Sequence, residues 1–225
     1  MRQVPHLNMY ILAFGMLFLT LWNCKEKPVP KATVEKAEMV QTISKTIKEI
    51  AIFADLSLTD TTDITTLMSF KEIDENGMLT ESDAQKTEQL FKALTKVKPL
   101  ASFPVVEIKN TTLVILVTKG KGFAGGIWAK ILIDRASGKV QKIQFDHIAE
   151  SEGYGSGITR KSFEDQFIGM PAYMEPNTLS LIQDGKVIGE GIYKIDGIAG
   201  ATATSKGVID MLHQGLENYQ NYLRP

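Results

Sequence analysis

Cysteine and histidine are scarce in this chain of 225 residues, which has one cysteine and three histidines. The single cysteine, Cys24, cannot form a disulfide within the chain. A metal site is also disfavoured. His147 and Glu150 lie close in the sequence, but His6 falls in an N-terminal apolar run and His213 on a predicted terminal helix, so no third ligand has a suitable spacing. We therefore expect no metal ion.

The chain also lacks an excess of charge of either sign. Lys and Arg total 25 and Asp and Glu total 26, which gives a net charge of −1. The two signs are interspersed, whereas a nucleic-acid-binding surface needs a basic patch, so we expect no nucleic-acid partner. Familiar catalytic motifs are missing from the sequence as well. Gly155-Ser156-Gly157 is not the G-x-S-x-G of a nucleophilic serine, and the glycine loop 120–126 has no Walker ending. We assign no catalytic residue.

Residues 1–24 are predicted to be a signal peptide with a lipobox, or a membrane anchor. The run from Met9 to Trp22 is apolar and carries no charge. It is short for a membrane-spanning helix, which needs about 20 residues, and it has the size of a signal-peptide core. Leu21-Trp22-Asn23-Cys24 resembles a relaxed bacterial lipobox, in which the cysteine is diacylated. The alternative is an uncleaved signal anchor. Both predict a protein tethered to the cell membrane and facing the periplasm or extracytoplasmic side.

The segment 25–32 contains two prolines among lysines and is expected to be a short extended linker. Residues 33–98 are predicted to be a helical N-terminal region that covers one face of the sheet that follows. Its first helix is expected to begin near Thr33, because apolar residues recur at helical spacing from Val40 to Ala51.

Three further features are predicted before the sheet. The Thr- and Asp-rich stretch Ser57–Thr66 favours a loop, and Asn76-Gly77 is a tight-turn signal. A second helix is predicted over Ser82–Lys96. Ser82 or Thr80 would cap it, and its apolar side would be formed by Leu90, Phe91 and Leu94.

Residues 99–225 form the predicted main domain, which begins with an antiparallel sheet. Runs rich in β-branched residues, separated by turn residues, predict four strands at Pro104–Lys109, Thr112–Lys119, Ile127–Asp134 and Val140–Asp146. A further strand is expected at Val187–Ile195 and a last helix at Ser205–Tyr222. This order of elements indicates an α+β fold, with an antiparallel sheet packed with N-terminal and C-terminal helices.

Two loops of this domain have the composition of binding loops. The glycine loop 120–126 is either an ordinary mobile hairpin connection or a place where a flat ligand approaches the backbone, with Trp128 beside it. The second loop is Asp146–Gly155. Its binding groups are a carboxylate, a hydroxyl, an aromatic ring and open backbone N–H groups, contributed by Glu150, Ser151, Tyr154, Gly153 and Gly155.

The stretch Asp196–Ser205 places three hydroxyl side chains where the last helix is expected to begin, namely Thr202, Thr204 and Ser205. One interpretation makes Ser205 or Thr204 the cap of that helix. The other places a phosphate there, because free N–H groups and the helix dipole both favour negative charge.

These three features occur in the same order as in the FMN-binding domain family, which the segment from about Gly120 to Tyr222 therefore resembles. The shared features are a glycine-rich loop with Trp128, the turn His147–Gly155, and the motif Asp-Gly-Ile-Ala-Gly-Ala-Thr ending at Thr202. The resemblance implies that FMN is attached through its phosphate to Thr202. It also implies a separate flavin transferase that uses FAD as donor and reads Asp196.

The resemblance further implies a membrane-tethered flavoprotein that transfers electrons together with redox partner subunits. The residues expected to contact the cofactor are Thr202, Ala201, Gly200, Asp196, Thr204, Ser205, Glu150, Ser151, Gly153, Tyr154, Gly155 and Trp128. The alternative is a lipid-anchored binding or structural module of the same fold without flavin. Ala199 supports this alternative, because the family usually has Ser or Thr at that position.

Overall fold

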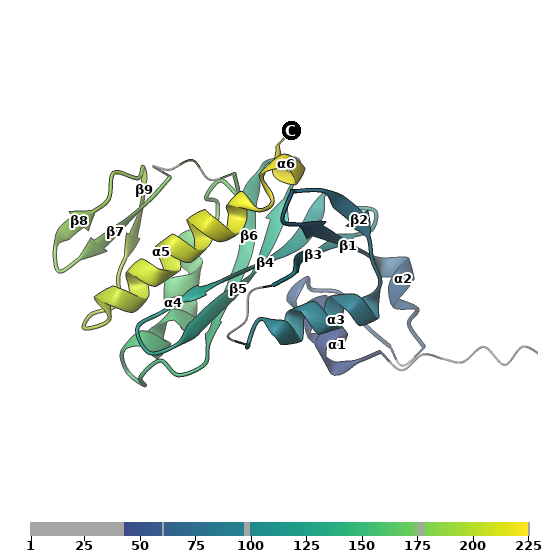
Figure 1. Ribbon diagram of the computed structural model, residues 1–225, viewed down its shortest axis with the longest axis horizontal. Coiled ribbons are helices and arrows are strands. Elements are labelled where there is room, and N and C mark those ends of the chain that lie inside the picture. Colours follow the sequence, from purple (N-terminus) through teal and green to yellow (C-terminus); the bar gives the residue numbers. More distant parts are fainter. Residues whose placement is uncertain (1–42, 60, 97–99, 174, 176–177, 225) are drawn as a thin grey trace, which may run out of the picture. The chain divides into compact units, whose positions relative to one another are not determined.

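A six-stranded antiparallel sheet organises the protein in this computed structural model, which describes residues 43–59, 61–96, 100–173, 175 and 178–224 (Figure 1). The strand order is β2-β1-β3-β4-β5-β6. The strands are β1 Met68–Asp74, β2 Leu79–Glu81, β3 Ser102–Ile108, β4 Leu113–Lys121, β5 Gly126–Asp134 and β6 Lys139–His147. The predicted α+β class is confirmed, as are the four predicted strands, whose ends differ by a few residues.

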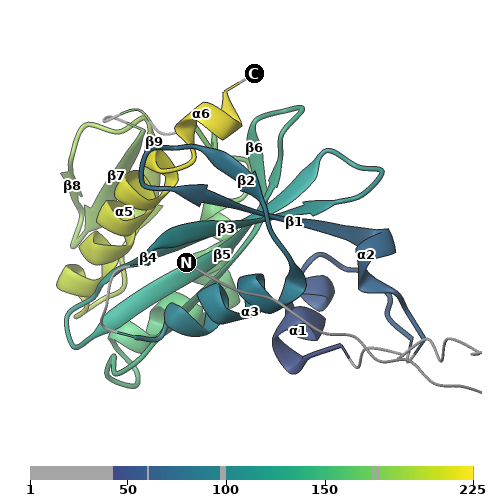
Figure 2. The same ribbon diagram turned by 45° about the vertical axis from the view of Figure 1, so that its right-hand side comes forward.

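Both faces of this sheet are covered, and for that reason the central strands are apolar on both sides. Val114, Ile115, Leu116 and Val117 of β4 are all buried. One face packs against α1 Lys45–Phe53 and α3 Ala84–Ala93, and the other packs against α5 Thr202–Glu217. Figure 2 shows α1 and α3 on one side of the sheet and α5 on the other. The N-terminal helices therefore cover one face of the sheet, as predicted.

The ends of the N-terminal helices differ from the predicted ends. The helix that contains Ile47 begins at Lys45, not near Thr33, because the Ser44 side chain accepts a hydrogen bond from the Ile47 N–H (3.3 Å) and caps it. Residues before 43 lie outside the described part of the chain. Asp83 caps α3 in place of Ser82 or Thr80, accepting from the Lys86 N–H at 2.7 Å.

The first hairpin of the sheet and the single helical turn before it were not predicted from the sequence. The turn at Asn76-Gly77 is confirmed, and it joins β1 to β2. The Asp74 carboxylate holds this turn by accepting from the Met78 N–H at 2.8 Å. Within the predicted loop Ser57–Thr66 a short helix begins, α2 Ile64–Leu67.

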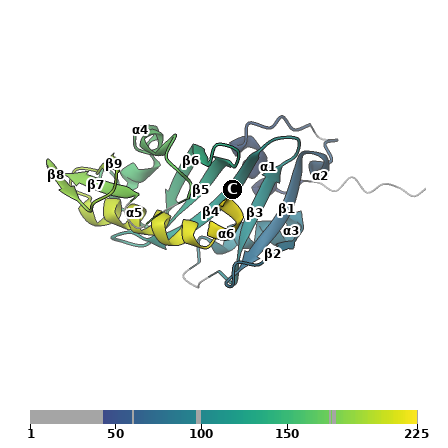
Figure 3. The same ribbon diagram turned by 90° about the horizontal axis from the view of Figure 1, so that it is seen from above.

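A second, three-stranded sheet lies beside α5 (Figure 3). Its strands are β7 Leu179–Gln183, β8 Lys186–Ile188 and β9 Tyr193–Asp196, in the order β8-β7-β9. The prediction of one continuous strand at Val187–Ile195 is therefore wrong, because this segment contains parts of two strands. The chain leaves the sheet after Ile188, crosses β7 and returns on its other side, where β9 runs parallel to β7. The Ser180 hydroxyl donates to the Gly191 carbonyl (3.0 Å) and holds the crossing segment.

The C-terminal helix is fixed to the sheet through Tyr219, which is fully buried between α5 and α6 Gln220–Leu223. Its hydroxyl lies 3.0 Å from the Val117 carbonyl and 3.3 Å from the Pro104 carbonyl. Proline has no N–H to donate across the β3–β4 pair, so the tyrosine hydroxyl supplies the donor that Val117 would otherwise lack. Among the described residues, no helix is both long and apolar enough to span a membrane.

Candidate functional site

The three sequence features meet at one buried carboxylate, that of Glu150. Its Oε1 accepts hydrogen bonds from the backbone N–H groups of Ala124 (2.8 Å) and Gly125 (3.2 Å) in the glycine loop. Its Oε2 accepts from the Thr204 hydroxyl in the first turn of α5 at 2.6 Å. Hydrogen bonds to an ionised acceptor are shorter and stronger than neutral ones. Glu150 therefore joins the glycine loop, the turn and the terminal helix.

Two glycines provide the space that this carboxylate occupies. A Cβ atom at Gly122 or at Gly155 would overlap the Glu150 carboxylate oxygens. His147 holds the backbone of Glu150, because its Nδ1 accepts a hydrogen bond from the Glu150 backbone N–H at 3.2 Å. The glycine loop thus approaches a protein side chain closely, and Glu150 is 7% exposed.

The last helix, α5, begins at Thr202, three residues before the predicted start. Neither Ser205 nor Thr204 caps it, because tertiary partners occupy both hydroxyls. Ser205 is buried and its Oγ accepts from the Ile198 N–H at 3.0 Å, while Thr204 donates to Glu150. The N-cap position is Ala201, and among the described residues no side chain caps this end. Thr202 remains exposed at the first helical position.

Three large apolar side chains are exposed in the glycine loop and in the turn, the two segments that Glu150 joins to the start of α5. Phe123 is 77% exposed, Tyr154 57% and Ile148 50%. Gly200 has a φ of +71°, and a Cβ there would lie 2.9 Å from the Tyr154 ring. The chain at Gly200 therefore passes directly over the tyrosine, which fixes both on the surface near Thr202.

Asp196 lies at the end of β9 with its side chain exposed. Its backbone is held by Gln166, whose Oε1 accepts from the Asp196 N–H (2.7 Å) and whose Nε2 donates to the Asp196 carbonyl (3.2 Å). Gln166 was not predicted as a site residue, because it lies 30 residues from its partner in the sequence. No local pattern marks it.

The remaining predicted contact residues fall into two groups. Ser151 and Gly153 are exposed in the turn, and the Ser151 carbonyl accepts from the N–H groups of Tyr154 and Ser156, both at 3.2 Å. Trp128 is not brought to Thr202. It packs with the cluster under α1 and α3, on the face of the sheet opposite to α5, because neighbouring residues of a strand alternate between faces.

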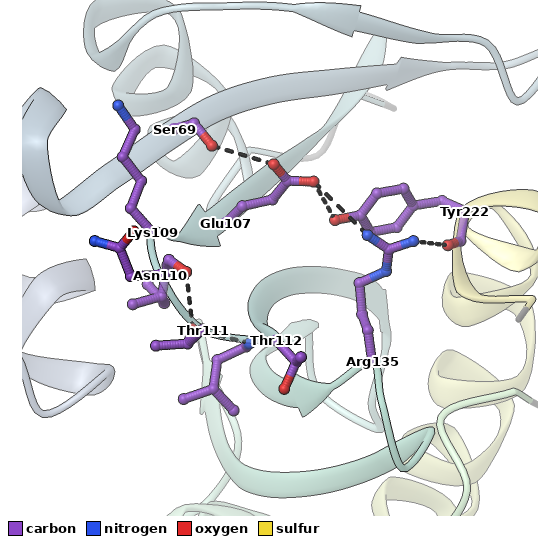
Figure 4. A pocket seen from close by; sticks show the side chains of 10 residues that line it. Ser69, Glu107, Lys109, Asn110, Thr111, Thr112, Arg135 and Tyr222 are labelled. Atoms are coloured by element: carbon purple, nitrogen blue, oxygen red, sulfur yellow. Dashed lines mark hydrogen bonds and ion pairs between the residues drawn. The ribbon is translucent and has the colours of Figure 1, made fainter.

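A pocket of about 330 Å³ lies elsewhere, at the opposite end of β4 from the glycine loop (Figure 4). Glu107 lies in its wall and accepts hydrogen bonds from the Tyr222 hydroxyl (2.7 Å) and from Ser69 (3.1 Å). Burial acts to raise the pKa of Glu107, but the hydrogen bonds from Tyr222 and Lys71 lower it below its ordinary value. Burial raises the pKa of Tyr222. The described residues hold no group of three His, Cys, Asp or Glu side chains placed for a metal ion.

Part of the chain is similar to a known protein family. Residues 122–217 match the model of a family described as the FMN-binding domain. This segment contains residues 122–126 of the glycine loop, the turn around Glu150 and the whole of α5. The resemblance to the FMN-binding domain family is therefore confirmed.

The individual relatives have one name in common. The chain is 28% identical over 154 residues to the C subunit of the Na(+)-translocating NADH-quinone reductase of Vibrio alginolyticus, a region that covers 60% of each chain. The corresponding protein of Haemophilus ducreyi is 26% identical over 102 residues, covering 45% of this chain and 40% of the relative. The aligned regions thus span less than two thirds of these relatives' own lengths.

Two solved structures share the fold. The crystal structure of the C subunit of the Na(+)-translocating NADH-quinone reductase from Parabacteroides distasonis gives a TM-score of 0.59 at 26% identity, covering 82% of this chain and 90% of that one. Shewanella oneidensis NqrC gives a TM-score of 0.58 at 19% identity, covering 80% and 98%. The second match supports the fold alone.

Proposed function

We propose that this protein carries FMN linked covalently by a phosphoester to the Thr202 hydroxyl and acts in electron transfer, as a membrane-tethered subunit of a redox complex. The observation that carries the proposal is the position of Thr202. It is an exposed hydroxyl at the first residue of a 16-residue helix, inside the segment that matches the FMN-binding domain family. Its two hydroxyl neighbours, Thr204 and Ser205, already have protein partners.

The residues around Thr202 fit FMN in both charge and polarity. A phosphoester at this position would place negative charge at the N-terminus of α5, where the helix dipole and backbone N–H groups stabilise anions. Exposed apolar side chains at Phe123, Ile148 and Tyr154 offer a surface for a flat aromatic ring. The exposed Ala203, with its small side chain, leaves the backbone on one side of Thr202 accessible.

Bound FMN supplies one- and two-electron chemistry, and the protein supplies binding, orientation and electrostatics. In this chain Thr202 would hold the phosphate, and Tyr154 and Phe123 would exclude water from part of the ring. Glu150 would act indirectly, because its carboxylate already has three protein donors. We propose that it holds the glycine loop and the first turn of α5 together and does not contact the ring directly.

The attachment step is a transfer from FAD catalysed by a separate flavin transferase that reads Asp196. The Thr202 Oγ1 would form a bond to the FMN-side phosphorus of FAD while the pyrophosphate bond breaks. AMP leaves and the hydroxyl proton is released, so the step involves no oxidation or reduction. Asp196 is suited to be read by a second protein because its side chain is exposed.

The tether is the second part of the proposal. Cys24 lies outside the described residues, and the lipobox-like sequence before it is the support for lipidation. Two acyl chains anchor a protein stably, whereas one chain gives only weak, reversible membrane binding. If Cys24→Ala leaves palmitate labelling and membrane fractionation unchanged, the lipoprotein assignment is wrong and a signal anchor is the better explanation.

Intact-mass measurement after co-expression with a flavin transferase tests FMN attachment. Wild-type protein should gain the mass of one FMN and Thr202→Ala should gain none. Thr202→Ser, which keeps a hydroxyl, is the matched control and should be modified. No added mass on the wild type, or equal loading of Thr202→Ala, would favour the alternative of a module without covalent flavin, which Ala199 supports. Potentiometric titration of the loaded protein then measures whether it cycles between redox states.

A further inference from the structure

We propose that Gln166 is a positioning residue for flavin attachment, which fixes the backbone of Asp196 so that the loop from Asp196 to Thr202 meets the flavin transferase in one conformation. The inference rests on the proposed function, because it requires that Asp196 is read and that Thr202 is the acceptor. The observation behind it is independent of that function. It is the pair of hydrogen bonds between one side-chain amide and both backbone groups of Asp196.

Gln166 pairs with Asp196 as a neighbouring strand would. β9 is one of the two edge strands of the three-stranded sheet, and one side of it pairs with β7, where Asp196 lies opposite Ile182. On the other side the N–H and carbonyl of an edge strand are normally left to water. At Asp196 the Gln166 amide satisfies both groups, accepting at 2.7 Å and donating at 3.2 Å.

The backbone that carries the Gln166 side chain is anchored in the core. Gln166 lies in the short 3-10 turn Asp165–Phe167, directly before the fully buried Phe167. The Phe167 ring packs against Phe145 and Phe163, with ring centroids 5.1 and 5.4 Å apart. Because the core holds this backbone, the Gln166 side chain can fix the backbone of Asp196 without moving together with the loop that follows Asp196.

Further hydrogen bonds hold the loop that follows Asp196. The Gly197 N–H donates to the Ile182 carbonyl (2.8 Å), and the Ile198 N–H donates to Ser205 Oγ (3.0 Å). The Ala201 N–H donates to the Ile198 carbonyl (2.9 Å). The exposed polar side chains at the two ends of this held loop are those of Asp196 and Thr202. Gln166 fixes the first of these ends.

A fixed loop lowers the entropy that an enzyme loses when it orders its protein substrate. The same bonds matter much less for the stability of the fold. Asp196 is exposed, so water can replace Gln166 at both backbone groups in a variant that lacks the amide. A positioning role therefore predicts a large effect on flavin transfer and a small one on thermal unfolding.

Steady-state flavin transfer from FAD, followed by intact mass with purified transferase and full-length acceptor protein, tests this role. Gln166→Met removes both hydrogen bonds, and Gln166→Glu keeps the acceptor but loses the donor. We expect kcat/KM to fall roughly tenfold for Gln166→Met, given the usual contribution of one or two hydrogen bonds, and less for Gln166→Glu. The Tm of both variants should stay within about 3 °C of wild type, the shift that a change of about 1 kcal/mol produces in a domain of this size.

Asp165→Ala is the matched control in the same turn. The Asp165 side chain forms an exposed ion pair with Lys161 (2.6 Å), and such pairs contribute little to stability. It should transfer flavin at the wild-type rate. If Gln166→Met keeps the wild-type kcat/KM, or if Asp165→Ala is impaired equally, the positioning role is wrong.

Failure of the proposed function gives a different result from failure of this inference. If wild-type protein takes up no FMN, both are refuted. If the wild type is loaded and Asp196→Ala is impaired while Gln166→Met is not, the proposed function stands and the role of Gln166 alone is refuted. A slow but complete loading of Gln166→Met, with unchanged Tm, supports the inference.

Discussion

Replacing Glu150 with alanine tests the hydrogen-bonded centre of the site. The change removes both oxygens that accept from Ala124, Gly125 and Thr204. The Thr204 hydroxyl is buried, so it would lose its partner without gaining water. A hydrogen bond to a charged group contributes about 1.5–3 kcal/mol. The two amides are only part-buried, and water can partly replace the lost acceptor there. We expect Glu150→Ala to lower the free energy of unfolding by about 3–5 kcal/mol.

Urea unfolding followed by circular dichroism measures this loss, and the Tm should fall by roughly 10 °C. Glu152→Ala is the matched control, because Glu152 is an exposed acid two residues away in the same turn. It should change the free energy of unfolding by no more than about 0.5 kcal/mol. Glu150→Gln keeps one oxygen and should fall between the two.

A double-mutant cycle with Thr204→Val isolates the shortest of the three bonds. In the wild-type background Thr204→Val removes a donor that Glu150 uses at 2.6 Å. In the Glu150→Ala background the same change should have a smaller effect, because the bond is already absent. Residues in direct contact typically show coupling of about 0.5–3 kcal/mol. A Glu150→Ala variant as stable as Glu152→Ala, or a cycle without coupling, would refute the idea that Glu150 joins the three segments.

Three further predictions concern single side chains. Tyr219→Phe leaves the Val117 carbonyl without its hydroxyl partner and should lower the free energy of unfolding by about 1–2 kcal/mol in urea titrations. An unchanged unfolding midpoint would contradict a stabilising role for this hydrogen bond. Burial lowers the pKa of His213, whose Nε2 accepts from the Leu179 N–H (3.3 Å), so the folded state takes up a proton less readily than the unfolded state. Stability should fall as pH drops below about 6.5, and His213→Gln should weaken that dependence in unfolding measured at pH 5 and 7. Gly200→Ala forces a residue with a side chain into a positive φ and should slow flavin loading, which intact mass measures. Loading of this variant at the wild-type rate would contradict the prediction.

The main sheet was predictable because its signals are local. In β3 to β6, β-branched residues occur in short runs, and turn residues such as Asn110, which has a φ of +61°, separate them. The strand β1 was missed for the opposite reason. Its charged residues Lys71 and Glu72 resemble a surface turn, but Lys71 pairs with Glu107 of β3 at 2.9 Å. A partner on another strand decides that Met68–Asp74 is a strand, and local periodicity cannot show it.

The start of the last helix shows the same limit within the site. Composition favours Ser205 or Thr204 as a cap, because hydroxyl residues at a helix start usually play that role. Here Thr204 binds Glu150, 54 residues earlier in the sequence, and Ser205 binds the loop before the helix. The helix therefore begins at Thr202 instead. The resemblance to a family predicts Thr202 as the attachment point, and the geometry shows that this hydroxyl differs from its two neighbours in being exposed.

The motifs shared with the family contain two kinds of residue that sequence alone does not separate. Glu150, Thr204 and Ser205 are buried and hold segments together, whereas Thr202 and Tyr154 are exposed. The distinction changes what a substitution means. Loss of a buried member should lower stability and flavin loading together, because the site is no longer assembled. Loss of an exposed member should lower loading alone. Measuring both quantities for each variant therefore assigns every motif residue to one group, including those for which the sequence suggested direct contact with the cofactor.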